Sequence, residues 1–351
     1  MGKKNSIQHL LIIRLSAMGD VAMLVPVILE LVKIHPQLQI TILTRKRFEP
    51  IFEEIPNISI FPADVKTKHK GIFGLFRLYR TLLKLQLDAV ADTHNVLRSS
   101  ILKCFFKFSG IPFIQINKGR KEKKLLTKKI NKVFKPLKTT HERYADVFKA
   151  LGLPITISQN NKLTKPKQPV TTKINLKNDV KLVGVAPFAA HKSKMYPLSM
   201  MEEVLALLIN EKNYQVVLFG GGSEEEAILQ DMADKLGDKV INTVGKLSFK
   251  EELALISNLN VMLAMDSGNG HLAANYGVEV VTLWGVTHPY AGFAPYGQSI
   301  ENSICADRQK YPLIPTSVYG NKFPEGYDKA METIAPTHVF KTIVELGKSN
   351  N

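Results

Sequence analysis

Short apolar runs alternate with segments of helical spacing along both halves of this chain, and this alternation limits the fold more than any other feature. Strands that alternate with helices form a parallel sheet with right-handed crossovers. In the first half, the pattern predicts strands at 7–15, 38–44 and 88–93 and helices at 21–36, 75–86, 96–110 and 141–154. In the second half, it predicts strands at 181–188, 214–220, 240–245, 260–266 and 278–285 and helices at 198–212, 224–236, 249–258 and 269–276.

The two series are separated by a polar, proline-containing stretch at 154–180, which is typical of a linker between domains. A chain of 351 residues is also long enough for two cores. We therefore expect an α/β protein with two Rossmann-like doubly wound domains, at 1–165 and 178–335, facing a central cleft. A last helix at 336–351 is expected to pack back toward the N-terminal domain. Ligands of such sheets bind at the carboxyl ends of the strands.

The excess of positive over negative charge lies in the first half of the chain. Residues 1–150 carry 28 Lys and Arg against 11 Asp and Glu, whereas residues 151–351 carry 19 against 20. The first half should therefore meet an anionic partner. Ten of these cations lie between Lys118 and Lys138, interleaved with apolar residues at Leu126, Ile130, Val133 and Leu137.

This spacing predicts a basic amphipathic helix at 120–137, suited to an anionic membrane surface or a phosphorylated acceptor. The alternative is a solvated helix whose apolar stripe packs on its own domain. No stretch of 18 apolar residues and no signal-peptide pattern occurs in the sequence, so we expect a cytoplasmic protein, peripheral at the inner membrane. The two cysteines, Cys104 and Cys305, lack the spacing of a zinc site or a disulfide framework.

The motif RLSAMGD at 14–20 places Asp20 in a turn between a predicted strand and a predicted helix. With Gly19 as its only glycine, the turn lacks the G-x-G-x-x-G pattern of dinucleotide binding. Asp20 is either the N-cap of the following helix or a general base at the mouth of the cleft.

The sequence MDSGNGH at 265–271 joins a predicted strand to a predicted helix. Unpaired amides at such a helix start bind anions, and a diphosphate fits this chemistry. We expect Asp266, Ser267, Gly268 and His271 to contact such a ligand. The alternative is that Asp266 and Ser267 only cap the helix, with His271 partly buried beside them.

Two further loops follow strands of the second half. Gly220–Gly222 allows close approach of a ligand, and a carboxylate just beyond it can accept hydrogen bonds from ribose hydroxyls, so we expect Gly222 and Glu225 to bind the donor. The alternative is that the glutamates complement the helix dipole. Lys192 and Lys194 lie on a loop where a lysine can neutralise a leaving phosphate, or can be an ordinary surface residue.

Five stretches of the chain together resemble glycosyltransferase family nine, the ADP-heptose:lipopolysaccharide heptosyltransferases. They are IIRLSAMGDVAMLVPVI, LDAVADTHNVLRSS, HKSKMYP, MDSGNGHLAANYGVEVVTLWGVTHP and AMETIAPTHVFKTIVEL. The resemblance implies a GT-B fold, with Asp20 as the catalytic base. It also implies that Lys194, rather than Lys192, contacts the donor phosphates, and that Thr287 is part of the donor site.

This family transfers heptose from ADP-heptose to the inner core of lipopolysaccharide with inversion of the anomeric centre. The resemblance therefore implies a nucleotide-sugar donor and a lipopolysaccharide acceptor, contacted by Ser16, Arg98 and Arg120. No pair of aspartates of the D-x-D kind occurs in a plausible metal-binding turn of the sequence, so we expect neither a metal nor another cofactor. The chain has Val286 where the family often has proline, and Ala330 where it often has cysteine. A transferase of another nucleotide sugar and a non-catalytic sugar- or nucleotide-binding protein remain as alternatives. Nucleic-acid binding is disfavoured, because the basic half lacks interleaved aromatic residues and a recognised binding module.

Overall fold

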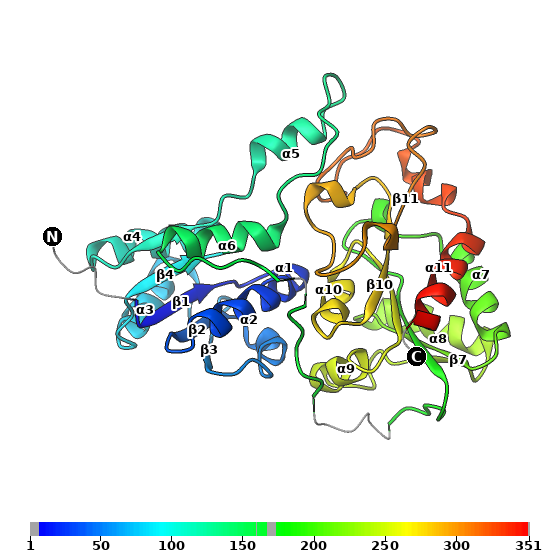
Figure 1. The fold of residues 1–351 in the computed structure, drawn as a ribbon, viewed down its shortest axis with the longest axis horizontal. Helices are drawn as coiled ribbons and strands as arrows, with labels where there is room; N and C mark the ends of the chain where they lie inside the picture. The colour runs from blue at the N-terminus through cyan, green and yellow to red at the C-terminus, as the bar shows by residue number, and fades with distance from the viewer. Residues whose placement is uncertain (1–6, 159, 167–172, 350–351) are drawn as a thin grey trace. The chain divides into compact units, whose positions relative to one another are not determined.

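The computed structural model describes residues 7–158, 160–166 and 173–349, which form two compact units (Figure 1). The first unit contains the chain up to Lys118 together with Thr140–Leu163. The second unit contains Gly119–Thr139 and the chain from Thr164 onward. The linker predicted at 154–180 thus spans the passage from one unit to the other, although residues 159 and 167–172 lie outside the described part.

The first unit is built on five parallel strands in the order β3-β2-β1-β4-β5. Their bounds are β1 His9–Ile13, β2 Gln39–Thr44, β3 Ile58–Pro62, β4 Ala89–Asp92 and β5 Phe113–Gln115. Three of these strands were predicted from their apolar runs. The other two, β3 and β5, are only partly buried and lie at the edges of the sheet, so they lack the continuous apolar signal of a central strand.

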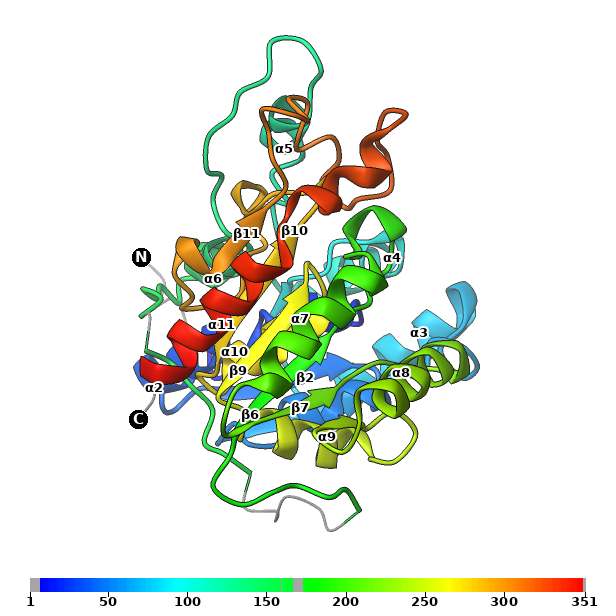
Figure 2. The same ribbon diagram turned by 90° about the vertical axis from the view of Figure 1, so that its right-hand side faces the viewer.

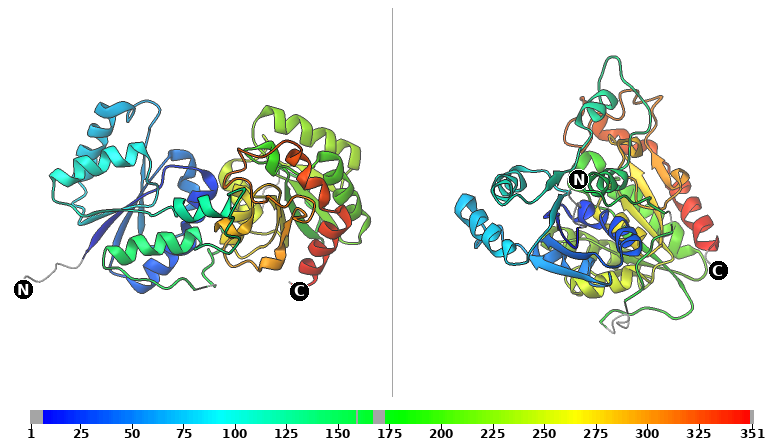
Figure 3. Two further views of the ribbon diagram at one scale, coloured as in Figure 1. Left: turned by 90° about the horizontal axis from the view of Figure 1, so that it is seen from above. Right: turned by 60° about the vertical axis from the view of Figure 1, so that its left-hand side comes forward.

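Helices cover both faces of this sheet (Figure 3). The helices of the first unit are α1 Met18–Ala22, α2 Val25–Ile34, α3 Gly71–Leu83, α4 Leu97–Phe108 and α6 Thr140–Ala150, with a 3₁₀ turn, η1, at Lys46–Ile51. One core cluster packs α3 and α4 against the sheet through Leu78, Leu82, Leu102 and Phe106. The helix predicted at 21–36 is divided into α1 and α2, because Pro26 lies in the first turn of α2, where proline is favoured.

The second unit contains six parallel strands in the order β11-β10-β9-β6-β7-β8. Their bounds are β6 Lys181–Ala186, β7 Tyr214–Leu218, β8 Val240–Asn242, β9 Val261–Met265, β10 Glu279–Trp284 and β11 Ser303–Cys305. Its helices are α5 Arg120–Leu126, α7 Leu198–Asn210, α8 Ser223–Leu236, α9 Phe249–Ile256, α10 Gly268–Asn275 and α11 Pro336–Ser349. The expectation of two doubly wound parallel sheets is therefore confirmed.

The C-terminal helix α11 lies beside α7 over the same sheet face as α8 (Figure 2). Its Val339 and Ile343 are fully buried in the core of the second unit, together with Met201 and Leu205 of α7. The expected return of this helix to the N-terminal domain is thus corrected: its apolar stripe completes the core of the second unit.

The basic amphipathic helix predicted at 120–137 is also corrected. Only α5 is helical, and Leu126 is buried whereas Ile130 is 79% exposed and Val133 is 39% exposed. The chain stops following a helix because Lys132 donates hydrogen bonds to the carbonyl oxygens of Leu126, Leu313 and Pro315, at 3.0, 2.9 and 2.7 Å. Three carbonyl acceptors satisfy all donors of one ammonium group.

The same segment, Gly119–Thr139, is held to the second unit by aromatic contacts. The ring of Phe134 lies 5.0 Å from that of His288 and 4.9 Å from that of Tyr290, with the guanidinium of Arg308 at 3.4 Å from its centre. The amide of Leu137 donates to the carbonyl oxygen of Tyr290 at 2.9 Å. These contacts explain why a segment expected in the N-terminal domain belongs to the second unit.

Candidate active site

Each sheet has one point where the strand order reverses, and ligands of doubly wound folds bind beyond the carboxyl ends of the strands at that point. In the first unit the reversal lies between β1 and β4, and in the second unit between β6 and β9. Most of the predicted site residues follow these four strands. The two groups are described separately below.

In the second unit, Lys194 follows β6 and Asp266 follows β9. The Nζ of Lys194 lies 2.8 Å from Oδ2 of Asp266, and the two side chains are only 12% and 9% exposed. The structure thus brings together two residues that lie 72 positions apart in the sequence. An ion pair with so little exposure fixes the ammonium group at the start of α10.

Close packing of the loop around Lys194 explains its position. The hydroxyl of the buried Ser193 donates to the carbonyl oxygen of Gly320. A Cβ at Gly320, which has a φ of +82°, would lie 2.6 Å from Cγ and Cδ of Lys194. A Cβ at Gly285 would lie 2.4 Å from the carbonyl oxygen of Ser193. Sequence reasoning missed Gly320, since nothing near it in the sequence indicates contact with a loop 126 residues away.

The first turn of α10 presents polar groups beside this ion pair. Ser267 is the N-cap residue, but its hydroxyl makes no capping hydrogen bond and has no hydrogen-bond partner among the described residues. The hydroxyl of Thr287, which is 1% exposed, also lacks one within that part of the chain. Gly268 is the first residue of α10, and His271 is buried in the same turn. Buried hydroxyl groups without partners are costly, so these two are suited to an incoming ligand.

The glycine loop after β7 has a different organisation from the one expected. Gly222 has a φ of +87°, and the amide of Gly221 donates to Oε2 of Glu225 at 2.7 Å. Glu225 therefore closes its own loop at the start of α8. Its other carboxylate oxygen is left for a ligand, and a contact with ribose remains a prediction.

In the first unit, Asp20 forms an ion pair with Arg14, which directly follows β1. Asp20 is the third residue of α1, whose N-cap is Ala17, so the alternative of Asp20 as the N-cap residue is corrected. Its carboxylate instead accepts a hydrogen bond from the Ala17 amide at 3.4 Å from within the first turn. The carboxylate is 32% exposed and the Arg14 side chain only 5%. The hydroxyl of Tyr144 donates to the carbonyl oxygen of Asp20 at 3.0 Å, and the Arg14 guanidinium lies 5.8 Å from the centre of its ring. Asp20 is thereby held at its backbone and at its side chain.

The loop after β4 completes this edge of the first sheet. The buried carboxylate of Asp92 accepts hydrogen bonds from the amides of His94 and Asn95, both at 2.9 Å. Nε2 of His94 lies 3.4 Å from the hydroxyl of Ser16, one of the predicted acceptor residues. Burial lowers the pKa of His94 to about 3, with further lowering by the positive charge of Arg14. The imidazole is therefore neutral at physiological pH and can exchange hydrogen bonds with hydroxyl groups.

An arginine cluster lies at the same edge. Arg45 follows β2, and burial together with the charges of Arg47 and Arg98 lowers its pKa. This effect brings the predicted Arg98 into one electrostatic group with two arginines that sequence reasoning missed. The sequence did contain an indication for Arg45, because this residue directly follows a strand, as Arg14 does. Arg120 belongs instead to Gly119–Thr139, the segment of the second unit.

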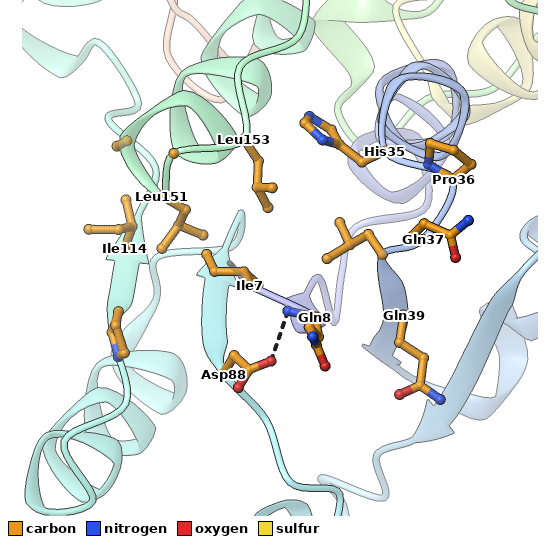
Figure 4. Close-up of a pocket in the computed structure, with 14 residues that line it drawn as sticks. Ile7, Gln8, His35, Pro36, Gln37, Gln39, Asp88, Ile114, Leu151 and Leu153 are labelled. Atoms are coloured by element: carbon orange, nitrogen blue, oxygen red, sulfur yellow. Dashed lines mark hydrogen bonds between the residues drawn. The ribbon is translucent and has the colours of Figure 1, made fainter. Parts of the chain in front are cut away.

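A hollow of about 1110 Å³ lies at the opposite edge of the first sheet (Figure 4). It is lined by Gln8, Gln39 and Ile114 at the beginnings of strands and by Leu151 and Leu153 after α6. Since Asp20 and His94 follow strand ends, this hollow is separate from the candidate site. Nowhere in residues 7–158, 160–166 and 173–349 do three or more His, Cys, Asp or Glu side chains gather as metal ligands. Metal independence stays a prediction.

Two parallel doubly wound sheets, each with polar side chains at its switch point, are the architecture of the GT-B fold. Solved structures agree with this assignment. A glycosyltransferase family 9 structure from Veillonella parvula DSM 2008 matches with a TM-score of 0.75 and 21% identity over 98% of both chains. The structure of Escherichia coli ADP-heptose lipopolysaccharide heptosyltransferase II matches with a TM-score of 0.70 and 18% identity, over 97% of this chain and 99% of that one.

Residues 75–319 match the sequence model of glycosyltransferase family 9, described as heptosyltransferase, and the chain belongs to this family. Over 314 residues it is 26% identical to the lipopolysaccharide core heptosyltransferase OpsX of Haemophilus influenzae, which covers 85% of this chain and 84% of that protein. The resemblance found in the five sequence stretches is thereby confirmed, and the protein is a glycosyltransferase.

Proposed function

We propose that this enzyme transfers heptose from ADP-heptose to the inner core of lipopolysaccharide, with inversion of the anomeric centre and without a metal ion. The names of its relatives, an ADP-heptose lipopolysaccharide heptosyltransferase and a lipopolysaccharide core heptosyltransferase, support this donor and this acceptor. The observation that carries the proposal is the buried ion pair of Lys194 and Asp266 beside the open N-terminus of α10.

On the donor side, Lys194 binds the diphosphate and neutralises the charge that develops when ADP leaves. The amides at the start of α10, from Gly268 onward, and the hydroxyl of Ser267 donate hydrogen bonds to the same group. Thr287 and His271 line the donor, while Gly222 and Glu225 bind its ribose. A lysine and a helix N-terminus supply the positive potential that a divalent ion supplies in other transferases, which is why no metal is needed.

On the acceptor side, Asp20 is the general base. The Asp20 carboxylate has two contacts, an ion pair with Arg14 and a hydrogen bond from the Ala17 amide at 3.4 Å, and both are made by Oδ2. Oδ1 therefore has no partner within the described chain. Oδ1 takes the proton of the acceptor hydroxyl while that oxygen attacks the anomeric carbon and the bond from that carbon to the diphosphate breaks. One displacement of this kind inverts the anomeric centre.

The acceptor of such a reaction carries phosphates and carboxylates, and the arginine cluster at the first sheet supports its binding there. Arg98 and Arg45 bind these anions, Ser16 orients the acceptor through its hydroxyl, and Arg120 makes a further contact. The reaction takes place in the cytoplasm at the inner membrane. None of the helices within the described residues is long and apolar enough to cross a bilayer.

Calorimetric titration with ADP, UDP and GDP in the presence of EDTA tests the donor. Selective ADP binding is expected, and a preference for UDP or GDP would point to another nucleotide sugar. The base is tested by Asp20→Asn, which should keep its ADP affinity and lose transfer by about 10²- to 10⁴-fold. Unchanged function of Asp20→Asn would favour the non-catalytic binding protein, and equal loss of ADP binding and transfer would favour a structural role for Asp20.

A further inference from the structure

The first two turns of α3 expose large apolar side chains on the side facing away from the core. Ile72 is 63% exposed, Phe73 is 89% exposed and Phe76 is 45% exposed, although the other side of α3 is buried through Leu75 and Leu78. Two adjacent exposed residues of this size cost free energy in water without contributing to the core. Their exposure indicates that this surface has a partner.

This apolar surface lies at the same edge of the first sheet as Asp20. Because α3 and α4 each follow a strand of a parallel sheet, both helices begin at the edge where those strands end. Contacts between the helices agree with a parallel arrangement, with ring centres 5.4 Å apart for Phe76 and Phe105 and 5.2 Å apart for Tyr79 and Phe106.

At the same end, the first residue of α4, Leu97, is 77% exposed. Within this apolar set, Ile72, Phe73 and Leu97 thus lie at the starts of the two helices, and Phe76 lies one turn further along α3, where its ring contacts that of Phe105 in the second half of α4.

A lysine-bearing turn directly precedes these residues. Asp64 accepts hydrogen bonds from the hydroxyl of Thr67 and from the amides of Thr67 and Lys66, the last two at 3.0 and 3.2 Å. These bonds fix the turn, and they lower the pKa of the Asp64 carboxyl group to about 2, with the Thr67 hydroxyl as the main cause. Lys66, Lys68 and Lys70 are all exposed. The aspartate is thus engaged within the turn, and the lysines face solvent.

The segments that carry the apolar set are rich in cations, and the nearest acidic residue before them is Asp64 of the preceding turn. Residues 65–87 contain six Lys and Arg and no Asp or Glu, and residues 93–121 also contain no acidic residue. On α3 itself, Arg77 and Arg80 continue the exposed side beyond Phe76. Exposed apolar side chains flanked by cations match the interface of an anionic bilayer, where aromatic side chains enter the acyl boundary and lysines meet the headgroups.

We propose that this surface, the α3–α4 face (Lys66–Arg80 with Leu97 and Arg98), docks on a leaflet of anionic phospholipid with Ile72 and Phe73 inserted. Docking at this edge brings the side of the sheet that carries Asp20 toward the bilayer. A second copy of the chain is a poorer occupant, because two cationic surfaces without acidic residues repel each other. The inference rests on the proposed function only in that the acceptor is anchored in a membrane.

A second exposed apolar position with neighbouring lysines occurs in Gly119–Thr139, where Ile130 is 79% exposed beside Lys128 and Lys129. It carries a single large side chain above 40% exposure, whereas the α3–α4 face carries four. The α3–α4 face is therefore the main contact, and Ile130 provides an internal comparison for the experiment.

Co-sedimentation with vesicles of phosphatidylcholine alone, or with 30 mol % phosphatidylglycerol (about three in ten lipids, to mimic a bacterial leaflet), tests the inference. The full-length protein should bind only the anionic vesicles, and release on raising the salt concentration is expected. Phe73→Ser should weaken binding by about tenfold or more. Lys68→Gln with Lys70→Gln should weaken it by about fivefold or more and reduce its salt dependence.

The matched control is Ile300→Ser, since Ile300 is 58% exposed but belongs to the second unit. This variant should bind vesicles as the wild type does. As an independent measurement, brominated lipid should quench the fluorescence of the tryptophan introduced by Phe73→Trp. It should not quench the native Trp284, which is fully buried.

Equal losses for Phe73→Ser and Ile300→Ser, or a loss confined to Ile130→Ser, would overturn the α3–α4 face as the docking surface. A concentration-dependent dimer abolished by Phe73→Ser, with no vesicle binding, would assign the face to self-association instead. ADP binding and transfer to a soluble acceptor are measured in parallel. If these persist while vesicle binding is absent, only the membrane inference fails, and if they are absent while vesicles bind, only the proposed function fails.

Discussion

The Nζ of Lys194 and Oδ2 of Asp266 lie 2.8 Å apart at the switch point of the second sheet, with side chains 12% and 9% exposed. The lysine comes from the loop after β6 and the aspartate from the end of β9, which are neighbouring strands. This pair has two separable consequences, one for stability and one for ligand binding. Removing either partner leaves the other charge buried and uncompensated.

Lys194→Met is expected to weaken ADP binding by about 10- to 100-fold, because it removes a charged hydrogen-bond donor to the diphosphate. It should also lower the free energy of unfolding of the second unit by about 3 kcal/mol, since Asp266 is then buried without a partner. The double variant Lys194→Met/Asp266→Leu should recover much of this stability but not ADP binding. Calorimetric titration and denaturant unfolding measure the two effects.

Lys192→Ala is the matched control, because Lys192 lies in the same 3₁₀ turn but is exposed. Its ADP affinity and stability should equal those of the wild type. If Lys194→Met kept the wild-type ADP affinity, the pair would be structural only and the donor site would lie elsewhere.

Gly320→Ala should damage the same site from a distance in sequence. The new Cβ would meet the side chain of Lys194 at 2.6 Å, and the φ of +82° adds backbone strain. We expect about tenfold weaker ADP binding, because displacement of Lys194 costs part of a charged hydrogen bond. Gly326→Ala separates the two causes, since Gly326 has a φ of +79° but open space around its Cβ. Equal ADP affinities of the two variants would show that the contact with Lys194 is unimportant.

The sequence predicted the doubly wound fold because each central strand is a continuous apolar run, as Leu10–Ile13 and Val261–Met265 illustrate. Prediction from the sequence was wrong where tertiary contacts override a local pattern. Leu126, Ile130, Val133 and Leu137 have helical spacing, yet the hydrogen bonds of Lys132 to distant carbonyl groups end the helix at Leu126. Spacing within a segment carries no information about acceptors that lie about 180 residues away.

The candidate site was predictable to a similar extent. Asp20, Lys194 and Asp266 follow predicted strands, and the rule that ligands bind at carboxyl ends of strands identifies them without coordinates. Their partners were not predictable, because pairing of Lys194 with Asp266 depends on the adjacency of β6 and β9 in the sheet. Gly320 was missed for the same reason: it contacts Lys194 through a fold that local sequence does not encode.

Lys132→Met is expected to loosen Gly119–Thr139, because the variant keeps the aliphatic chain but leaves three carbonyl groups without their donor. The loss of one charged donor costs about 2 kcal/mol. Cleavage by chymotrypsin at Phe134 under native conditions should become faster. Lys129→Met is the control, since Lys129 lies three residues away and is exposed. Equal cleavage rates for the two variants would contradict the anchoring role of Lys132.

Acidification should destabilise the first unit through His94. Burial and the charge of Arg14 lower the pKa of His94 to about 3, so the folded protein keeps the imidazole neutral while the unfolded chain takes up a proton near pH 6.5. Because the unfolded state binds more protons between these values, stability is fully present above pH 6.5 and falls as the pH is lowered toward 3. The loss amounts to about 1.4 kcal/mol for each pH unit within this window.

Three other groups titrate in the same range and require a comparison between variants. Burial lowers the pKa of His69 and lowers that of His288 to about 4, and both act in the same direction as His94. Burial raises the pKa of Glu252 to about 7, which acts in the opposite direction. The difference between wild type and His94→Gln isolates His94, since the three other groups are common to the two proteins. Between pH 7.5 and pH 5.0 (an interval chosen around the unfolded pKa of about 6.5), His94→Gln should lose less thermal stability than the wild type. His338→Gln, at an exposed position, should follow the wild type, and a steeper loss in His94→Gln would show that His94 is protonated in the folded protein.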